Sequence, residues 1–334
     1  MGLPVYIISR IMNYLLVIFV AVTLCFVIPR VTGSSPIETV INRLTAYGEY
    51  YDPITLQGII ESLKELYGLK GSLWEQYITF LKRLFTLDLG PSLTEFPTPV
   101  SVLINRSLPW TIGLLSITTL ISWLFAIFIG GIAGYFEESK IAKFLTGFSI
   151  VVHNIPYYIL GLCFILLFSY LIPLFPAGGG YSVGTELTFS IRSILDVLYH
   201  AILPALSLII VSYGGGFIIM RGLSITTKNE EYTKFAEIMH LNKNTILYKY
   251  IIRNSLLPQV TGLAISLGNI FTGSLALEVV FSYPGLGSLL YRALITSDYN
   301  LIMGITIYSI FAITTSLLIL DFIYPFIDPR IRYR

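Results

Sequence analysis

The sequence predicts an all-α polytopic membrane protein with six transmembrane helices. Its composition is the first reason, because 55% of its residues are hydrophobic and 12% are charged, whereas soluble domains carry about 25% charged residues. The second reason is that the apolar residues gather in six long runs, each close to the roughly 20 residues that a helix needs to cross a bilayer. Uninterrupted runs of this length exclude a β-barrel, and helices then satisfy the backbone inside lipid.

The predicted spans cover about 10–29, 109–135, 142–173, 199–220, 258–281 and 300–325. The first follows Arg10 and has an apolar core of about 18 residues. Since no small-residue cleavage signal follows that core, we expect a retained helix and not a signal peptide. The chain is thereby divided into an N-terminal transmembrane helix (1–29), an extracytoplasmic helical segment (30–108), a transmembrane core (109–325) with a polar loop (221–257), and a C-terminal tail (326–334).

Basic residues predict which side of the membrane each loop faces, because short cytoplasmic loops are rich in Lys and Arg. With a cytoplasmic N-terminus, twelve Lys and Arg fall on the cytoplasmic side, and two, Arg192 and Arg292, fall in the short outer loops. The twelve are Arg10, Lys140, Lys143, Arg221, Lys228, Lys234, Lys243, Lys249, Arg253, Arg330, Arg332 and Arg334. The sequence therefore predicts that both termini and the 221–257 loop are cytoplasmic.

The outer segment is too long for a simple connection and contains two amphipathic stretches. Apolar residues recur at helical spacing in 54–69 and again in 74–85, and turn residues separate the two stretches. These helices could shield the outer ends of the bundle, or they could provide a docking surface for an extracytoplasmic partner. The two interpretations are compatible.

The polar loop 221–257 predicts two short helices on the cytoplasmic side. Asn229 is the expected N-cap of the first, and Tyr232, Phe235, Ala236 and Met239 then form one apolar stripe. A turn at 241–244 leads into a second helix, and Pro258 is expected to start the next span. From the pattern alone, the pair could lie on lipid headgroups or fit a groove on a soluble partner.

The sequence contains no motif for nucleic-acid binding, metal binding or catalysis. A net charge of +2 does not favour nucleic-acid binding. The three histidines lack metal-ligand spacing, and Cys25 and Cys163 both lie in apolar runs. Motifs of a phosphate-binding loop, a serine hydrolase or a zinc protease are not present. We therefore expect no catalytic residue, no metal site and no cofactor in this chain, which disfavours a membrane-embedded enzyme. A secondary transporter would leave the polar loop unexplained.

The polar loop resembles the EAA loop of ABC-importer permeases of the dipeptide/oligopeptide branch. That branch reads R-x-x-x, about ten further residues, and then Y-x-x-x-A-x-x-x-G-L. The corresponding residues of this chain are Arg221, Tyr232, Ala236 and Leu241. Pro258 follows His240 by 18 residues, so His240 stands where the family has its glycine. This departure leaves open whether the sharp bend after the first loop helix is kept.

The resemblance extends along nearly the whole chain in five collinear blocks, 66–93, 106–121, 199–208, 277–304 and 321–332. It implies a permease subunit in the cell membrane that pairs with a second, homologous permease. Two ATP-binding subunits would hold ATP and Mg at the cytoplasmic face, and a solute-binding protein would deliver the substrate from outside. Oligopeptides are the preferred substrate, with oligosaccharides and nickel as alternatives. The implied ATPase-coupling residues are Tyr232, Phe235, Ala236, Met239, His240 and Leu241.

A carboxylate near the predicted outer end of the fifth span is a candidate functional group, because buried charge is expensive in a membrane. This residue is Glu278, and its expected partner is either Arg292 or the backbone of the turn that follows. The turn contains Pro284, Gly285 and Gly287, and with Glu278 it forms a possible outer gate. The glycines at 130, 134 and 214–216 are expected to allow close helix packing.

Overall fold

The computed structural model describes residues 3–31, 52–86 and 88–327. All of the secondary-structure elements named in this part of the chain are helices, which confirms the all-α prediction. The basic residues at 330, 332 and 334, most of the predicted tail (326–334) and residues 32–51 of the outer segment lie outside the described residues.

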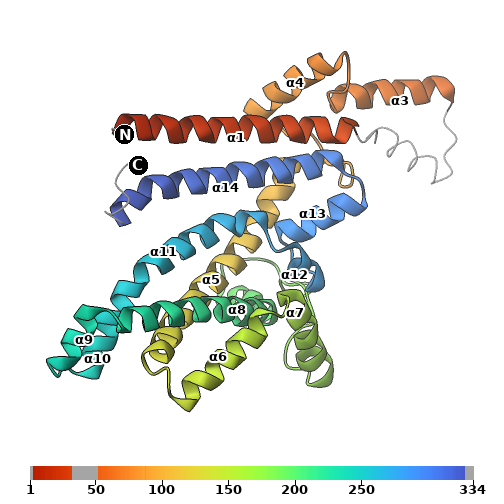
Figure 1. Cartoon of the computed structure of the whole chain (residues 1–334). Helices are drawn as coiled ribbons and strands as arrows, with labels where there is room; N and C mark the ends of the chain where they lie inside the picture. Colours follow the sequence, from red (N-terminus) through yellow and green to blue (C-terminus); the bar gives the residue numbers. More distant parts are fainter. Residues whose placement is uncertain (1–2, 32–51, 87, 328–334) are drawn as a thin grey trace.

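The described helices follow one another without a sheet. They are α1 (Leu3–Val31), α3 (Pro53–Leu66), α4 (Leu73–Phe85), α5 (Val100–Tyr135), α6 (Lys140–His153), α7 (Tyr157–Ile165), η1 (Leu166–Leu171), α8 (Ile191–Lys228), α9 (Glu231–Ile238), α10 (Lys243–Thr245), η2 (Ile246–Ile252), α11 (Arg253–Gly268), η3 (Asn269–Thr272), α12 (Leu275–Val280), α13 (Leu286–Ile295) and α14 (Tyr299–Ile327). Figure 1 shows α1 and α14 side by side, with the beginning of α1 next to the end of α14.

Four described helices, α1, α5, α8 and α14, are long and apolar enough to cross a membrane. The predicted span 142–173 is not one helix, because α6 and α7 meet at an angle of 94° where Pro156 interrupts the backbone. The predicted span 258–281 is also divided, since α11 ends at Gly268 and Gly273 adopts a φ of 71° before α12. The described residues thus contain four candidate spans, or five if the bent pair counts as one, against the six predicted.

Helix α5 is the centre of the molecule and contributes to each of the four buried apolar clusters of the described residues. Its most extensive partner is α8, and glycine sets the distance between them. A Cβ atom built on Gly134 would lie 2.7 Å from the Arg221 carbonyl oxygen and 2.5 Å from Ser224 Cβ. The Ser224 hydroxyl donates a 2.8 Å hydrogen bond to the Gly131 carbonyl oxygen. The expectation of close glycine packing is therefore confirmed here.

The paired helices α1 and α14 are joined by polar contacts near the chain ends. Arg10 Nη1 lies 3.2 Å from Asp321 Oδ2, and the Tyr14 hydroxyl lies 3.1 Å from the Thr315 hydroxyl. The Tyr6 hydroxyl donates to the Asp321 carbonyl oxygen. These contacts hold the beginning of α1 and the end of α14 on the same side of the bundle.

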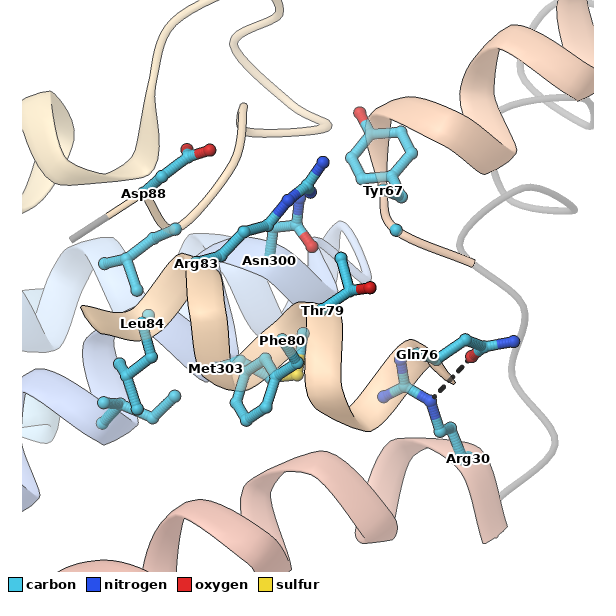
Figure 2. Close-up of a pocket in the computed structure, with 14 residues that line it drawn as sticks. Arg30, Tyr67, Gln76, Thr79, Phe80, Arg83, Leu84, Asp88, Asn300 and Met303 are labelled. Atoms are coloured by element: carbon cyan, nitrogen blue, oxygen red, sulfur yellow. Dashed lines mark hydrogen bonds between the residues drawn. The ribbon is translucent and has the colours of Figure 1, made fainter. Parts of the chain in front are cut away.

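The two helices predicted in the outer segment are α3 and α4. A small cavity, with a volume of about 50 Å³, lies where α4 approaches α1 and α14. Figure 2 shows the residues that line it. Arg30 Nε donates to Gln76 Oε1 across it at 3.3 Å, and Arg83 donates to the Leu66 carbonyl oxygen at the end of α3. Burial, with a smaller contribution from Asp298, raises the pKa of Tyr67 to about 12. The Tyr67 hydroxyl therefore stays neutral at physiological pH. The hydrogen bonds of Arg30 and Arg83 connect α4 to α1 and to the end of α3.

Candidate functional site

The polar loop 221–257 forms the end of α8, the short helix α9 and the start of the helix that leads into α11. The prediction that Asn229 caps the loop helix is wrong, because α8 continues to Lys228 and Asn229 caps its C-terminus. Glu230 is the N-cap of α9 instead. Pro258 lies inside α11 and does not start a span. These differences arise because the polar stretch prolongs the membrane helices on both sides of α9.

Helix α9 presents a group of exposed apolar side chains. Phe235 is 62% exposed, Ile238 71% and Met239 61%. Tyr232 is 43% exposed, and Leu241, just after the helix, is also partly exposed. We call Tyr232, Phe235, Ile238 and Met239 the apolar knob. The sequence pattern identified three of its members but missed Ile238.

Ala236 does not belong to the exposed stripe, and its prediction as a surface contact is wrong. Its side chain is 2% exposed and lies in a buried cluster with residues of α5, α8 and η2. The cluster also contains Ile127, Tyr135, Met220, Ile246, Leu247, Ile251 and Ile252. The small side chain of Ala236 therefore lets α9 pack against the bundle. Helical periodicity alone could not reveal that Ala236 is buried, because it lies between the exposed Tyr232 and Met239 on the helix.

The sharp bend after α9 is kept despite the histidine. His240 has a φ of 53°, the left-handed conformation that glycine adopts at the end of many helices. The His240 N–H donates to the Glu237 carbonyl oxygen and the Leu241 N–H donates to that of Ala236, which is the hydrogen-bond pattern of a Schellman motif. His240 Nδ1 lies 2.8 Å from the Ile238 carbonyl oxygen. The bend thus comes from the backbone pattern, with histidine in the place of glycine.

This conformation makes a prediction about position 240. His240→Gly and His240→Asn should keep the bend, since both residues tolerate a positive φ. His240→Val should destabilise it by about 1–2 kcal/mol, because a β-branched residue is strained in this region. Limited proteolysis of the loop in detergent measures the difference, and equal cleavage of all three variants would contradict it.

Helix α9 is attached firmly to the membrane helices. The Thr233 hydroxyl donates a 2.8 Å bond to the Thr227 carbonyl oxygen, and the Thr227 hydroxyl lies 3.1 Å from the Ser255 hydroxyl. Lys228 Nζ lies 3.1 Å from Glu137 Oε1 at the end of α5. A force on α9 would therefore reach α8 directly, and through α8 it would reach α11 and the end of α5. The sequence analysis did not single out Glu137 or Ser255, because neither has a local pattern of its own.

Glu278 is fully buried and organises the turn between α12 and α13. Its Oε1 accepts a 2.8 Å hydrogen bond from the Thr111 hydroxyl of α5. Its Oε2 accepts bonds from the backbone N–H groups of Gly287 at 2.7 Å and Ser288 at 3.1 Å. The expectation of a backbone partner is confirmed. The alternative partner, Arg292, instead lies 3.6 Å from Glu95.

The glycines of this turn are required by the close approach of the carboxylate. A Cβ atom on Gly285 would lie 2.3 Å from Glu278 Oε2, and one on Gly287 would lie 2.6 Å from the Leu275 Cα atom. Pro284 packs near Gly180, where a Cβ atom would lie 2.8 Å from the Pro284 Cδ atom. The four residues predicted as a gate therefore form one compact unit with α5, and whether that unit gates a pathway stays a prediction.

A second buried carboxylate, Asp298, was not identified as a site residue from the sequence. It precedes α14 and accepts hydrogen bonds from the Leu301 N–H, the Ser92 hydroxyl and the Thr94 N–H. Asn300 Nδ2 donates to the Pro91 carbonyl oxygen at 3.0 Å. These bonds fasten the segment before α5 to the start of α14. The sequence feature that could have pointed to Asp298 was its pairing with Tyr299 in the 277–304 block.

Comparison with known proteins places these features in context. Residues 126–333 match the family described as binding-protein-dependent transport system inner membrane component. The chain is 30% identical over 328 residues to the oligopeptide transport system permease protein AppB of Bacillus subtilis, covering 98% of this chain and 99% of that protein.

Two further relatives align with the chain over nearly its full length. It is 28% identical over 334 residues to the oligopeptide transport system permease protein OppB of Haemophilus influenzae, with 98% of this chain and 99% of the relative covered. It is 26% identical over 327 residues to the dipeptide transport system permease protein DppB of Bacillus subtilis, with 98% and 97% covered. The similarity thus includes α1 and the segment before α5 as well as the core.

Proposed function

Because this chain belongs to the family of binding-protein-dependent transport system inner membrane components, we propose that it is the permease subunit of an ATP-driven importer. It forms half of a translocation pathway for oligopeptides. The observation that carries this proposal is similarity to oligopeptide and dipeptide permeases over 98% of the chain. These relatives favour peptides over oligosaccharides or nickel, and they favour a transport subunit over a membrane-embedded enzyme or a secondary transporter.

The proposed complex contains a second, homologous permease, two ATP-binding subunits and an extracytoplasmic solute-binding protein. ATP and Mg are bound by the ATP-binding subunits, and this chain supplies no catalytic residue. The apolar knob of α9 supports a protein partner at this end, because an exposed aromatic and aliphatic group on a short helix suits insertion into a groove. The basic residues around it favour a cytoplasmic location for the knob and both termini.

A reconstituted complex tests this function. The tagged chain should copurify with a second permease and an ATP-binding subunit when these subunits are coexpressed with it. In proteoliposomes, uptake of a labelled oligopeptide should then require both ATP and the solute-binding protein. Uptake by this chain alone without ATP would contradict the importer, and ATP-dependent uptake of an oligosaccharide in place of peptides would contradict the substrate.

A further inference from the structure

An apolar groove with a volume of about 330 Å³ lies between the end of α5 and the beginning of α6. Three of the side chains that line it are exposed, Ile132 at 38%, Phe136 at 43% and Ile141 at 72%. Among the described residues of the lining, Ser139 has the one polar side chain, and its hydroxyl already accepts a 3.1 Å hydrogen bond from the Ala142 N–H. The groove is therefore apolar and open to the outside of the chain.

The apolar surface of the groove continues along α6, which Figure 1 shows at the edge of the molecule. Phe144 and Phe148 are exposed and follow Ile141 at the spacing of one helix face. Helix α6 has 14 residues and is therefore about 21 Å long. The hydrocarbon layer of one membrane leaflet is about 15 Å thick. The groove and this face together are long enough to hold an acyl chain.

The two acidic residues of the turn between α5 and α6 are already paired with lysines. Glu138 Oε2 lies 2.9 Å from Lys143 Nζ, and both of these side chains are exposed. Glu137 Oε1 lies 3.1 Å from Lys228 Nζ at the end of α8. Each carboxylate of the turn is thus balanced by a cation of its own.

A third lysine of the turn, Lys140, has no such partner. It lies between Ser139 and Ile141, which both line the groove. Its side chain is exposed and makes neither an ion pair nor a hydrogen bond with the part of the chain that the structure describes. A long lysine side chain can cover apolar surface with its methylene groups while its ammonium group stays in water. A free positive charge therefore lies beside an apolar groove, which is the complement of an anionic headgroup attached to an acyl chain.

We propose that this groove binds one anionic phospholipid of the cytoplasmic leaflet, with an acyl chain along Ile132, Phe136 and Ile141 and the headgroup phosphate at Lys140. The site requires the cytoplasmic location of this side of the bundle that is proposed above. A soluble phosphate ester would meet the charge of Lys140 but would gain no apolar contact. A zwitterionic phospholipid would gain the apolar contact but less of the attraction to the lysine. A phospholipid with a net negative charge obtains both, and it would hold the end of α5 to the beginning of α6.

The test measures lipid retention by native mass spectrometry of the full-length chain in detergent, alone and in the reconstituted complex. Both should retain phosphatidylglycerol in preference to phosphatidylcholine, and glycerol phosphate, which has no acyl chains, should not compete. Lys140→Gln should weaken the retention of phosphatidylglycerol about fivefold, the effect of one lysine near an anionic lipid surface. Lys140→Arg keeps the charge and should bind like the parent. Lys82→Gln removes an exposed lysine of α4 in the outer segment, and this matched control should also bind like the parent.

A second pair of variants tests the apolar part of the site. Ile132→Trp should narrow the groove and weaken retention by a similar factor, whereas Leu124→Trp, at an exposed position of α5 outside the groove, should not. Equal retention of the two phospholipids by the parent, or unchanged retention of phosphatidylglycerol by Lys140→Gln or Ile132→Trp, would overturn the site. Retention by the isolated chain but not by the complex would show that another subunit covers the groove, and would overturn it as well. These measurements do not depend on peptide uptake, so their failure would leave the proposed importer function intact.

Discussion

Phe235→Asp is expected to separate this chain from the proposed ATP-binding subunit without unfolding it. Phe235 is 62% exposed in the centre of the apolar knob, so aspartate is well solvated there, and surface substitutions of this kind usually change stability by about 0.5 kcal/mol or less. An aromatic anchor at an interface often contributes about 2 kcal/mol or more to binding. We therefore expect at least a tenfold loss of affinity for the ATP-binding subunit, measured by copurification, and a comparable loss of peptide uptake.

Two matched variants separate contact from folding. Lys234→Asp places the same residue at the neighbouring exposed position, outside the knob, and should retain the partner. Ala236→Asp puts a carboxylate into the buried cluster beneath α9 and should destabilise the chain by about 3–5 kcal/mol. Its effect should therefore be visible as lowered thermal stability of the isolated chain. If Phe235→Asp lowers that stability equally, or if Lys234→Asp releases the partner equally, the apolar knob is not the contact.

Glu278→Leu is expected to disrupt the turn between α12 and α13. The substitution leaves the Thr111 hydroxyl and the Gly287 and Ser288 N–H groups buried without their acceptor. Each of these three unsatisfied donors costs about 1–3 kcal/mol, so the free energy of unfolding should fall by about 3–9 kcal/mol. Thermal unfolding of the purified chain in detergent measures this loss, and an unchanged midpoint would contradict the assigned role of the carboxylate.

Glu278→Gln distinguishes a structural role from a gating role. The amide keeps the size of the side chain and one acceptor oxygen, so it should lose only about 1–2 kcal/mol of stability. If the turn also gates the pathway, this variant should still alter peptide-stimulated ATP hydrolysis in the reconstituted complex. Unchanged uptake and unchanged stimulation would leave Glu278 with the structural role alone.

Much of the fold could be predicted because membrane helices are specified by composition over long windows. The spans at α1, α5, α8 and α14 follow from long runs of apolar residues, and a single residue within such a run does not change the prediction. The breaks at Pro156 and Gly273 were missed, since a hydropathy window averages over the single residues that turn the backbone. The sequence did not decide whether the bend at His240 is kept, because the residue type at one position does not report the hydrogen bonds of the neighbouring backbone.

The sequence by itself determined that this protein is an all-helical membrane permease, because hydrophobic length and collinear motif blocks are properties of the chain alone. The tertiary structure decided which residues of those motifs are exposed and which are buried inside the chain. Ala236 is buried and Ile238 is exposed, and Glu278 accepts hydrogen bonds from Thr111 and from the turn that follows it. Burial and hydrogen bonding depend on which other helix lies opposite a residue, and helical periodicity carries no information about that neighbour.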